Sequence, residues 1–119
     1  MVMTGDLDDA WAAYKAGDYQ KAIRLWRPLA EQGNVRAQNN LAHAHAKGLG
    51  VSQDWKAAAK WWAFAAEQGY ARSQTSLGWV YHKGLGVPQD QKLAMKWTRL
   101  AAAQGDEKAK INLSCCIKD

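Results

Sequence analysis

The side chains best suited to metal binding or nucleophilic chemistry are three histidines, His43, His45 and His82, and the adjacent pair Cys115 and Cys116. His43 and His45 are two residues apart, so on a helix they point to different faces and do not chelate one metal. Two cysteines do not build a structural zinc site unaided. No Ser/His/Asp or Cys/His set has a recognisable spacing. We therefore expect no metal site, no cofactor and no enzymatic activity.

The two cysteines are neighbours in the chain. Adjacent cysteines rarely pair, because a disulfide needs a separation and direction that they seldom provide. We therefore expect a fold without disulfides, which favours a reducing compartment. The N-terminus shows neither the basic nor the apolar segment of a signal peptide, so we expect a cytoplasmic location, or a periplasmic or secreted one if a leader was removed. No apolar run approaches the roughly 20 residues of a membrane span.

A repeat of 36 residues dominates the sequence. Residues 34–69 and 70–105 align without a gap, and 18 of the 36 positions are identical. Residues 18–33 form a partial copy at the same offset, and residues 106–119 resemble the first part of a copy. Self-similarity at a fixed period of this length is typical of stacked helical repeats.

Each copy is predicted to contain two helices. In the copy at 34–69 the first helix ends at Lys47 and Gly48, since glycine suits the left-handed conformation that follows a helix. The second helix begins at Asp54, whose carboxylate can accept from free backbone N–H groups, and ends at Gly69. The G-x-G-V segment between them lacks the G-K-[ST] continuation of a phosphate loop, and the turn explains its glycines.

A single helix pair cannot bury its apolar face alone, whereas stacked pairs can. We therefore predict an all-α solenoid of about three helix-turn-helix repeats plus a C-terminal capping helix, as one domain over 1–119. The units are predicted at residues 5–33, 34–69 and 70–105, with the cap at 106–119. Leu41, Leu77 and Leu113 should point into the core, and Trp61 and Trp97 should fill the space between repeats. Pro28 lies inside a predicted helix, where a kink is expected.

The repeated motif resembles that of the Sel1-like repeat family, a relative of the tetratricopeptide repeats. The resemblance is carried by the residues from Leu41 through Gly48-Leu49-Gly50-Val51 to the terminal Ala65-Ala66-Glu67-Gln68-Gly69, and by their copy from Leu77 to Gly105. It implies a right-handed α/α superhelix that acts as an adaptor or scaffold. Some cysteine-rich members carry one disulfide per repeat. The absence of such paired cysteines argues against that subgroup and its penicillin-binding activity.

In such superhelices the first helix of each pair usually lines a concave groove. Helical geometry relative to the core leucines then predicts the groove-facing residues. The partner-binding residues are predicted to be Arg36, Asn39, His43, Arg72, Thr75, Trp79, His82 and Lys108. The same reasoning adds Asp8, Ala12, Lys15, Ala46, Lys47, Lys83, Ile111, Cys115, Lys118 and Asp119, with Lys47 and Lys83 interpreted mainly as partners of helix C-termini. Cys116 aligns with buried positions and should be buried.

The net charge of +5 and pI of about 9.3 reflect 16 basic against 11 acidic residues, a mild excess. We predict a protein-interaction module whose groove binds a protein or an acidic peptide. A nucleic-acid-binding function ranks below it, since the basic residues recur among acidic ones rather than in dense stripes. A hydrolase or β-lactam-binding relative ranks lower still. The chain is expected to be a monomer or a weak homodimer formed at its C-terminal end through Ile111, Cys115 and Ile117.

Overall fold

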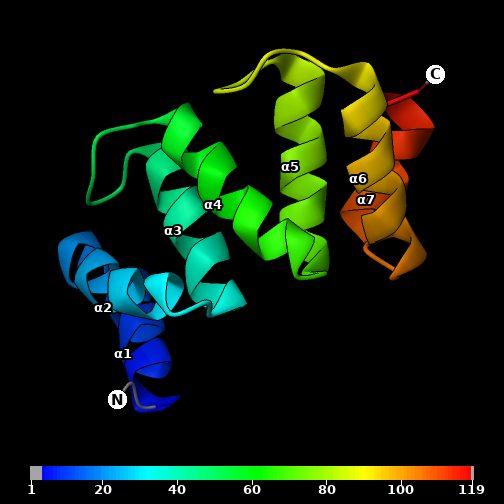
Figure 1. Cartoon of the computed structure of the whole chain (residues 1–119). Helices are drawn as coiled ribbons and strands as arrows, with labels where there is room; N and C mark the ends of the chain where they lie inside the picture. Colours follow the sequence, from blue (N-terminus) through cyan, green and yellow to red (C-terminus); the bar gives the residue numbers. More distant parts are fainter. Residues whose placement is uncertain (1–3, 119) are drawn as a thin grey trace.

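The structure, a computed structural model, describes residues 4–118 (Figure 1). Within this range the chain forms seven α-helices and no β-strand. They are α1 (Thr4–Lys15), α2 (Tyr19–Glu31), α3 (Val35–Lys47), α4 (Trp55–Glu67), α5 (Ala71–Lys83), α6 (Gln91–Ala103) and α7 (Glu107–Cys115).

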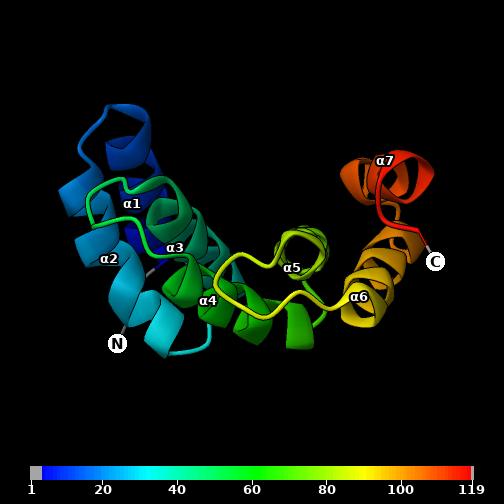
Figure 2. The same cartoon turned by 90° about the horizontal axis from the view of Figure 1, so that it is seen from above.

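The helices follow one another as an elongated stack of about 43 × 27 × 23 Å. Each helix packs mainly against its neighbours in the sequence, from α1 against α2 to α6 against α7. Seen from above, α1, α3, α5 and α7 lie on one side of the stack, and α2, α4 and α6 lie on the other (Figure 2). The prediction of an all-α, right-handed superhelical solenoid of three helix pairs and a capping helix is confirmed.

The helix boundaries follow the predicted capping chemistry. The carboxylates of Asp54 and Asp90 accept from the backbone N–H groups of Ala57 and Leu93, each at 3.1 Å. These bonds satisfy N–H groups that have no partner inside the helix. At the C-terminal ends of α3 and α5, Gly48 and Gly84 adopt the left-handed conformation with φ 69° and 71°, as expected for a glycine after a helix.

The second glycine of each G-x-G-V loop, Gly50 or Gly86, allows the loop to contact the backbone of the preceding helix pair. A Cβ atom on Gly50 would lie 2.8 Å from the carbonyl of Tyr19 at the start of α2. A Cβ atom on Gly86 would overlap the backbone of Trp55 and Lys56 at the start of α4. The sequence explained these glycines only by the helix turn, whereas the structure adds a contact between repeats.

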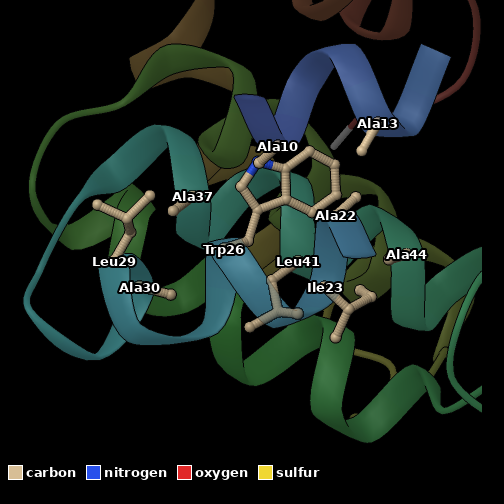
Figure 3. Packing of buried hydrophobic residues seen from close by; sticks show 10 residues of the cluster. All are labelled: Ala10, Ala13, Ala22, Ile23, Trp26, Leu29, Ala30, Ala37, Leu41 and Ala44. Atoms are coloured by element: carbon tan, nitrogen blue, oxygen red, sulfur yellow. The ribbon is translucent and has the colours of Figure 1, made fainter. Parts of the chain in front are cut away.

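The core is divided along the stack rather than gathered at one centre. The first cluster is built around Trp26 and Leu41 with small alanines from α1, α2 and α3 (Figure 3). The second contains Trp62, Leu77 and Val80, and the third is formed around Met95 with Ile117. The predicted inward orientation of Leu41 and Leu77 is confirmed, because both are almost fully buried.

Trp61, Trp97 and Leu113 are only partly buried, although each packs against a core cluster. The fully enclosed tryptophans are Trp26 and Trp62, which occupy the same repeat position. Trp61 and Trp97 therefore lie at the edge of the core, where they are partly exposed. The buried alanines allow neighbouring helices to pack closely.

Identical glutamines connect successive repeats through buried hydrogen bonds. The side-chain nitrogen of Gln38 donates to the carbonyl of Ala30 at 3.0 Å, and Gln68 donates to the side-chain oxygen of Gln38 at 3.1 Å. The same pair of bonds recurs one repeat later, where Gln104 donates to Gln74 at 2.9 Å. Since each bond satisfies a polar group near the core, these glutamines fix the spacing between helix pairs.

Helix α2 continues through Pro28 to Glu31. The proline lies in the last turn of the helix and its side chain is exposed. A proline at this position removes one backbone hydrogen bond, but only three residues of the helix follow it.

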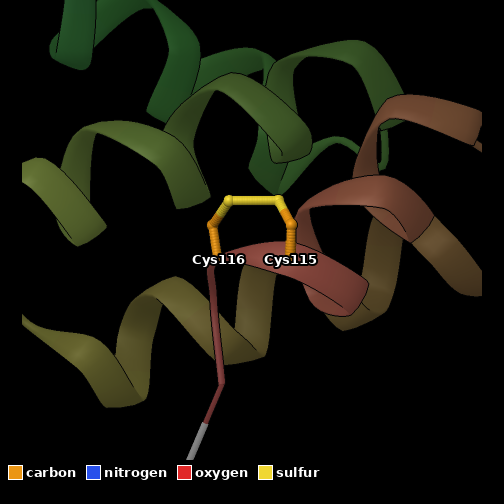
Figure 4. The surroundings of a disulfide bond; sticks show 2 residues. All are labelled: Cys115 and Cys116. Carbon is orange, nitrogen blue, oxygen red and sulfur yellow. A yellow bond between two sulfur atoms is a disulfide. The ribbon is translucent and has the colours of Figure 1, made fainter.

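The C-terminal end differs from the sequence-based expectation. Cys115 and Cys116 form a disulfide bond with each other, and both side chains are exposed (Figure 4). The predictions of a fold without disulfides and of a buried Cys116 are therefore wrong. The alignment of Cys116 with buried residues assumed that the helix runs to Ile117, but α7 ends at Cys115. Because the chain turns there, Ile117 takes the buried place.

The close approach of loop and helix gives a stability prediction. Gly86→Ala should lower the free energy of unfolding more than Gly69→Ala does. Because both glycines have a positive φ, either substitution lowers the free energy of unfolding by about 1–2 kcal/mol through the backbone conformation alone. A Cβ atom at Gly69 meets no atom within 4 Å, whereas at Gly86 it overlaps backbone. Urea unfolding followed by circular dichroism measures both, and equal losses would contradict the contact described above.

Candidate functional site

Two hollows lie on the face formed by the odd-numbered helices. The first, called the N-terminal pocket here, has a volume of about 570 Å³. Its walls come from the beginnings of α1, α3 and α5. It is lined by Leu7, Asp8, Trp11, Arg36, Asn40, Tyr70 and Arg72.

The second hollow, called the C-terminal pocket here, has a volume of about 430 Å³. Its walls come from α3, α5 and α7, with two tryptophans from α4. It is lined by His43, Ala46, Lys47, Trp55, Trp62, Thr75, Ser76, Trp79, Val80, Lys108 and Asn112. Concave sites that combine apolar walls with a few polar groups are the usual form of a ligand site.

The structure divides the eight predicted partner-binding residues among three settings. Arg36 and Arg72 line the N-terminal pocket. Lining the C-terminal pocket are His43, Thr75, Trp79 and Lys108. Asn39 and His82 line neither pocket. Arg36, Arg72 and Lys108, which recur at the 36-residue period, are thus divided between the pockets, with the two arginines in the first and the lysine in the second. Asp119, which was also predicted to face the groove, lies outside the described residues.

Asn39 is buried and lines neither of the two pockets. Its side chain is 5% exposed, and its amide oxygen accepts from the hydroxyl of Ser73 at 2.9 Å. The bond joins α3 to α5 across two repeats. Helical spacing places Asn39 on the groove side, but the close packing of α5 covers it.

Trp79 is held by its own helix. The ring of His82 lies 5.4 Å from the ring of Trp79, and the Nζ atom of Lys83 lies 5.2 Å from its centroid. Nδ1 of His82 donates to the side-chain oxygen of Gln91 at 3.0 Å, which fixes the imidazole. His82 and Lys83 therefore support the wall of the C-terminal pocket.

His43 is the histidine that lines the C-terminal pocket. Its ring makes an edge contact with Trp62, with 5.1 Å between centroids. Burial, together with the smaller effect of the nearby charges of Lys47 and Lys108, lowers the pKa of His43 to about 4. At neutral pH the imidazole is therefore uncharged.

Several pocket residues escaped the sequence-based prediction. Trp62 and Asn112 were not predicted to face the groove, whereas Lys47 was predicted to face it but was interpreted mainly as a partner of a helix end. A signal was present, because Asn40, Ser76 and Asn112 recur at the repeat period, each directly before a core leucine. All three line one of the two pockets. A polar residue repeated directly before a leucine that packs in the core thus coincides with the pocket lining.

The opposite face carries a further hollow of about 590 Å³ between α2 and α4, which includes Arg27, Lys60 and Phe64. Phe64 is exposed there, and burial lowers the pKa of His45, which lines the same hollow. No helix within the described residues is long and apolar enough to cross a membrane. No group of three or more His, Cys, Asp or Glu residues suited to a metal occurs between residues 4 and 118.

The lowered pKa of His43 gives a prediction about pH. The unfolded chain protonates its histidine near pH 6.5, whereas the folded chain does so only near pH 4. The unfolded state therefore binds more protons in this window, and stability falls as the pH falls through it. The free energy of unfolding should fall less in His43→Phe, which keeps an aromatic ring beside Trp62, than in the wild type. Between about pH 7.5 and about pH 4.5 the difference between the two decreases should be roughly 2 kcal/mol. Urea unfolding at the two pH values measures this, and parallel losses in both proteins would contradict it.

Comparison with known proteins adds to the geometry. Sel1 repeats match residues 12–34, 35–70 and 71–106. A Sel1 repeat protein from Oxalobacter formigenes is 37% identical with a TM-score of 0.85, over 89% of this chain and 44% of that chain. The antigen c5321 of uropathogenic Escherichia coli, which displays an SLR fold, is 35% identical with a TM-score of 0.83. The match covers 88% of this chain and 23% of that chain.

Helicobacter pylori cysteine rich protein B shares the fold at 24% identity and a TM-score of 0.74, over 79% of this chain and 71% of that chain. No curated protein matches the sequence. The chain spans less than half the length of the first two solved relatives. Sel1 repeats are generally protein–protein interaction modules, and their scaffold is generally non-catalytic. With three matching repeats over most of its length, the chain belongs to the Sel1 repeat family.

Proposed function

We propose that this chain is an interaction module that binds an acidic peptide segment of a partner protein along the face of the odd-numbered helices. The observation that carries the proposal is the position of the two pockets, which share this face and together span α1 to α7. A peptide in extended form advances about 3.3 Å per residue, so a short segment can reach from one pocket to the next.

The charges of the two pockets favour an acidic ligand. Arg36 and Arg72 are exposed in the N-terminal pocket, and Lys47 and Lys108 are exposed in the C-terminal pocket. Asp8 is the one acidic residue among the described linings of the two. Arginine and lysine bind carboxylates through charge-assisted hydrogen bonds, and complementary charge raises the rate of association.

Trp79 supplies the apolar part of the interaction. It is partly exposed in the C-terminal pocket and is held in place by His82 and Lys83. A rigid, partly exposed tryptophan in a concave site is the type of residue on which interface affinity commonly depends.

The test is selection of binders from a random peptide library on the immobilised wild-type chain, followed by titration of the selected peptides. Arg36→Glu with Arg72→Glu should weaken binding at least tenfold, because two attractive charges become repulsive. Arg24→Glu with Lys56→Glu makes the same change in net charge on α2 and α4 and is the matched control. Both variants must retain the helical circular dichroism of the wild type.

Enrichment of acidic peptides whose binding is lost only in the groove variant supports the proposal. Equal losses in both variants would show that net charge alone drives binding. Peptides that bind the groove variant as well as the wild type would place the interaction on another face, such as the hollow between α2 and α4.

Trp79→Ala is expected to weaken the selected peptides by roughly tenfold or more. Trp97→Phe is the control on another helix, since Trp97 is also partly buried but lines neither pocket. Isothermal titration calorimetry measures both affinities, and an unchanged affinity in Trp79→Ala would remove this residue from the site.

A further inference from the structure

The C-terminal pocket contains buried hydrogen-bond donors that the fold does not use. The Nε1 atom of Trp62 and the Nδ2 atom of Asn112 are both buried and have no hydrogen-bond partner among the described residues. The two side chains are 3% and 7% exposed, and both line this pocket. A buried donor without a partner destabilises a fold, and native structures contain few of them.

A single unpaired indole does not by itself mark a site. Trp26 occupies the same repeat position as Trp62, and its Nε1 atom is also buried and without a partner among residues 4–118. Trp26 lies in the first core cluster and lines neither groove pocket. The difference at Trp62 is the second unused donor, on Asn112, which comes from another helix and lines the same pocket.

The charges around these donors define the group that would satisfy them. Lys47 and Lys108 line the same pocket, and His43 beside Trp62 is neutral at pH 7. None of the described residues that line this pocket is acidic. Two N–H donors with two lysine ammonium groups on the same pocket favour an acceptor with negative charge. A carboxylate offers acceptor sites for both donors and has no competing donor of its own.

The depth of the donors decides how the carboxylate is carried. Trp62 and Asn112 are nearly enclosed, whereas Trp79 and the two lysines are more exposed. A glutamate side chain carries its carboxylate on two methylene groups, so it can enter between apolar walls while the peptide backbone stays outside. A chain-terminal carboxylate is attached directly to the backbone and lacks this reach.

We propose that the C-terminal pocket is a subsite for a glutamate side chain of the bound peptide, whose carboxylate accepts from Trp62 and Asn112 and is neutralised by Lys47 and Lys108. The proposal deepens the proposed function and rests on it for the identity of the ligand as a peptide. Its geometry does not involve the N-terminal pocket, so the two can be tested apart.

The first experiment uses a probe that needs no peptide partner. N-acetyl-glutamate amide is titrated into the ¹⁵N-labelled chain up to its solubility limit, and the indole signals of the seven tryptophans are followed by NMR. Trp62→Phe and Trp26→Phe assign the two buried indoles. The Trp62 indole proton should move downfield, as expected for a new charge-assisted bond, while the Trp26 signal stays in place.

Matched probes separate the chemistry. N-acetyl-glutamine amide, which keeps the shape and lacks the charge, should give no saturable shift at Trp62. N-acetyl-alanine with a free carboxylate tests a chain-terminal source. A shift with the alanine probe equal to that with the glutamate probe, an equal shift with the glutamine probe, or an unmoved Trp62 signal overturns the proposal.

The second experiment separates binding from folding. Asn112→Leu removes the unused donor, so it should weaken the glutamate probe by roughly tenfold or more while leaving the thermal midpoint unchanged or raised. A purely structural asparagine would instead lower the midpoint. Trp26→Phe, which also removes a buried unpaired donor, should leave probe affinity unchanged; equal weakening in both variants would contradict the assignment.

The outcomes also distinguish this inference from the proposed function. A Trp62 shift with the glutamate probe, together with a library selection that yields no groove-dependent peptide, supports the subsite and removes the peptide function. Groove-dependent peptides that bind Asn112→Leu as well as the wild type support the function and remove the subsite.

Discussion

The stacking of the helix pairs depends on how closely each of the two G-x-G-V loops approaches the helix pair before it. Gly50 meets the backbone of Tyr19, and Gly86 meets the backbone of Trp55, at contacts that leave no room for a side chain. These contacts recur at the repeat period and set the spacing between pairs. With this spacing fixed, the odd-numbered helices lie on one side of the stack (Figure 2).

Hydrogen bonds between glutamines hold the same spacing on the side away from the loops. Gln38 and Gln74 each join their helix to the preceding repeat, and Gln68 and Gln104 reach back to them. Apolar packing alone allows neighbouring helices to slide, because dispersion contacts have little directionality. A buried amide that must find its partner restricts the register, so the pockets keep their shape from one repeat to the next.

Much of the fold could be predicted because its signals are local. An aspartate before a helix and a glycine after it act within a few residues, and the 36-residue offset locates Asp54 and Asp90 or Gly48 and Gly84 together. The site was harder, since burial depends on neighbours distant in the sequence. Helical spacing predicted that Arg72 and Trp79 face the groove, and both line a pocket. It could not show that Ser73 would bond to Asn39 or that the turn after α7 would bury Ile117 in place of Cys116.

The nearest-neighbour packing of the helices has a mechanical consequence. Helices α3 and α7 lie in different parts of the stack and are connected mainly through the helices between them, so small rotations at each interface add up along the stack. The C-terminal pocket takes walls from both α3 and α7. The width of this pocket is therefore coupled to the curvature of the superhelix, so a change in the winding of the helices would widen or narrow it.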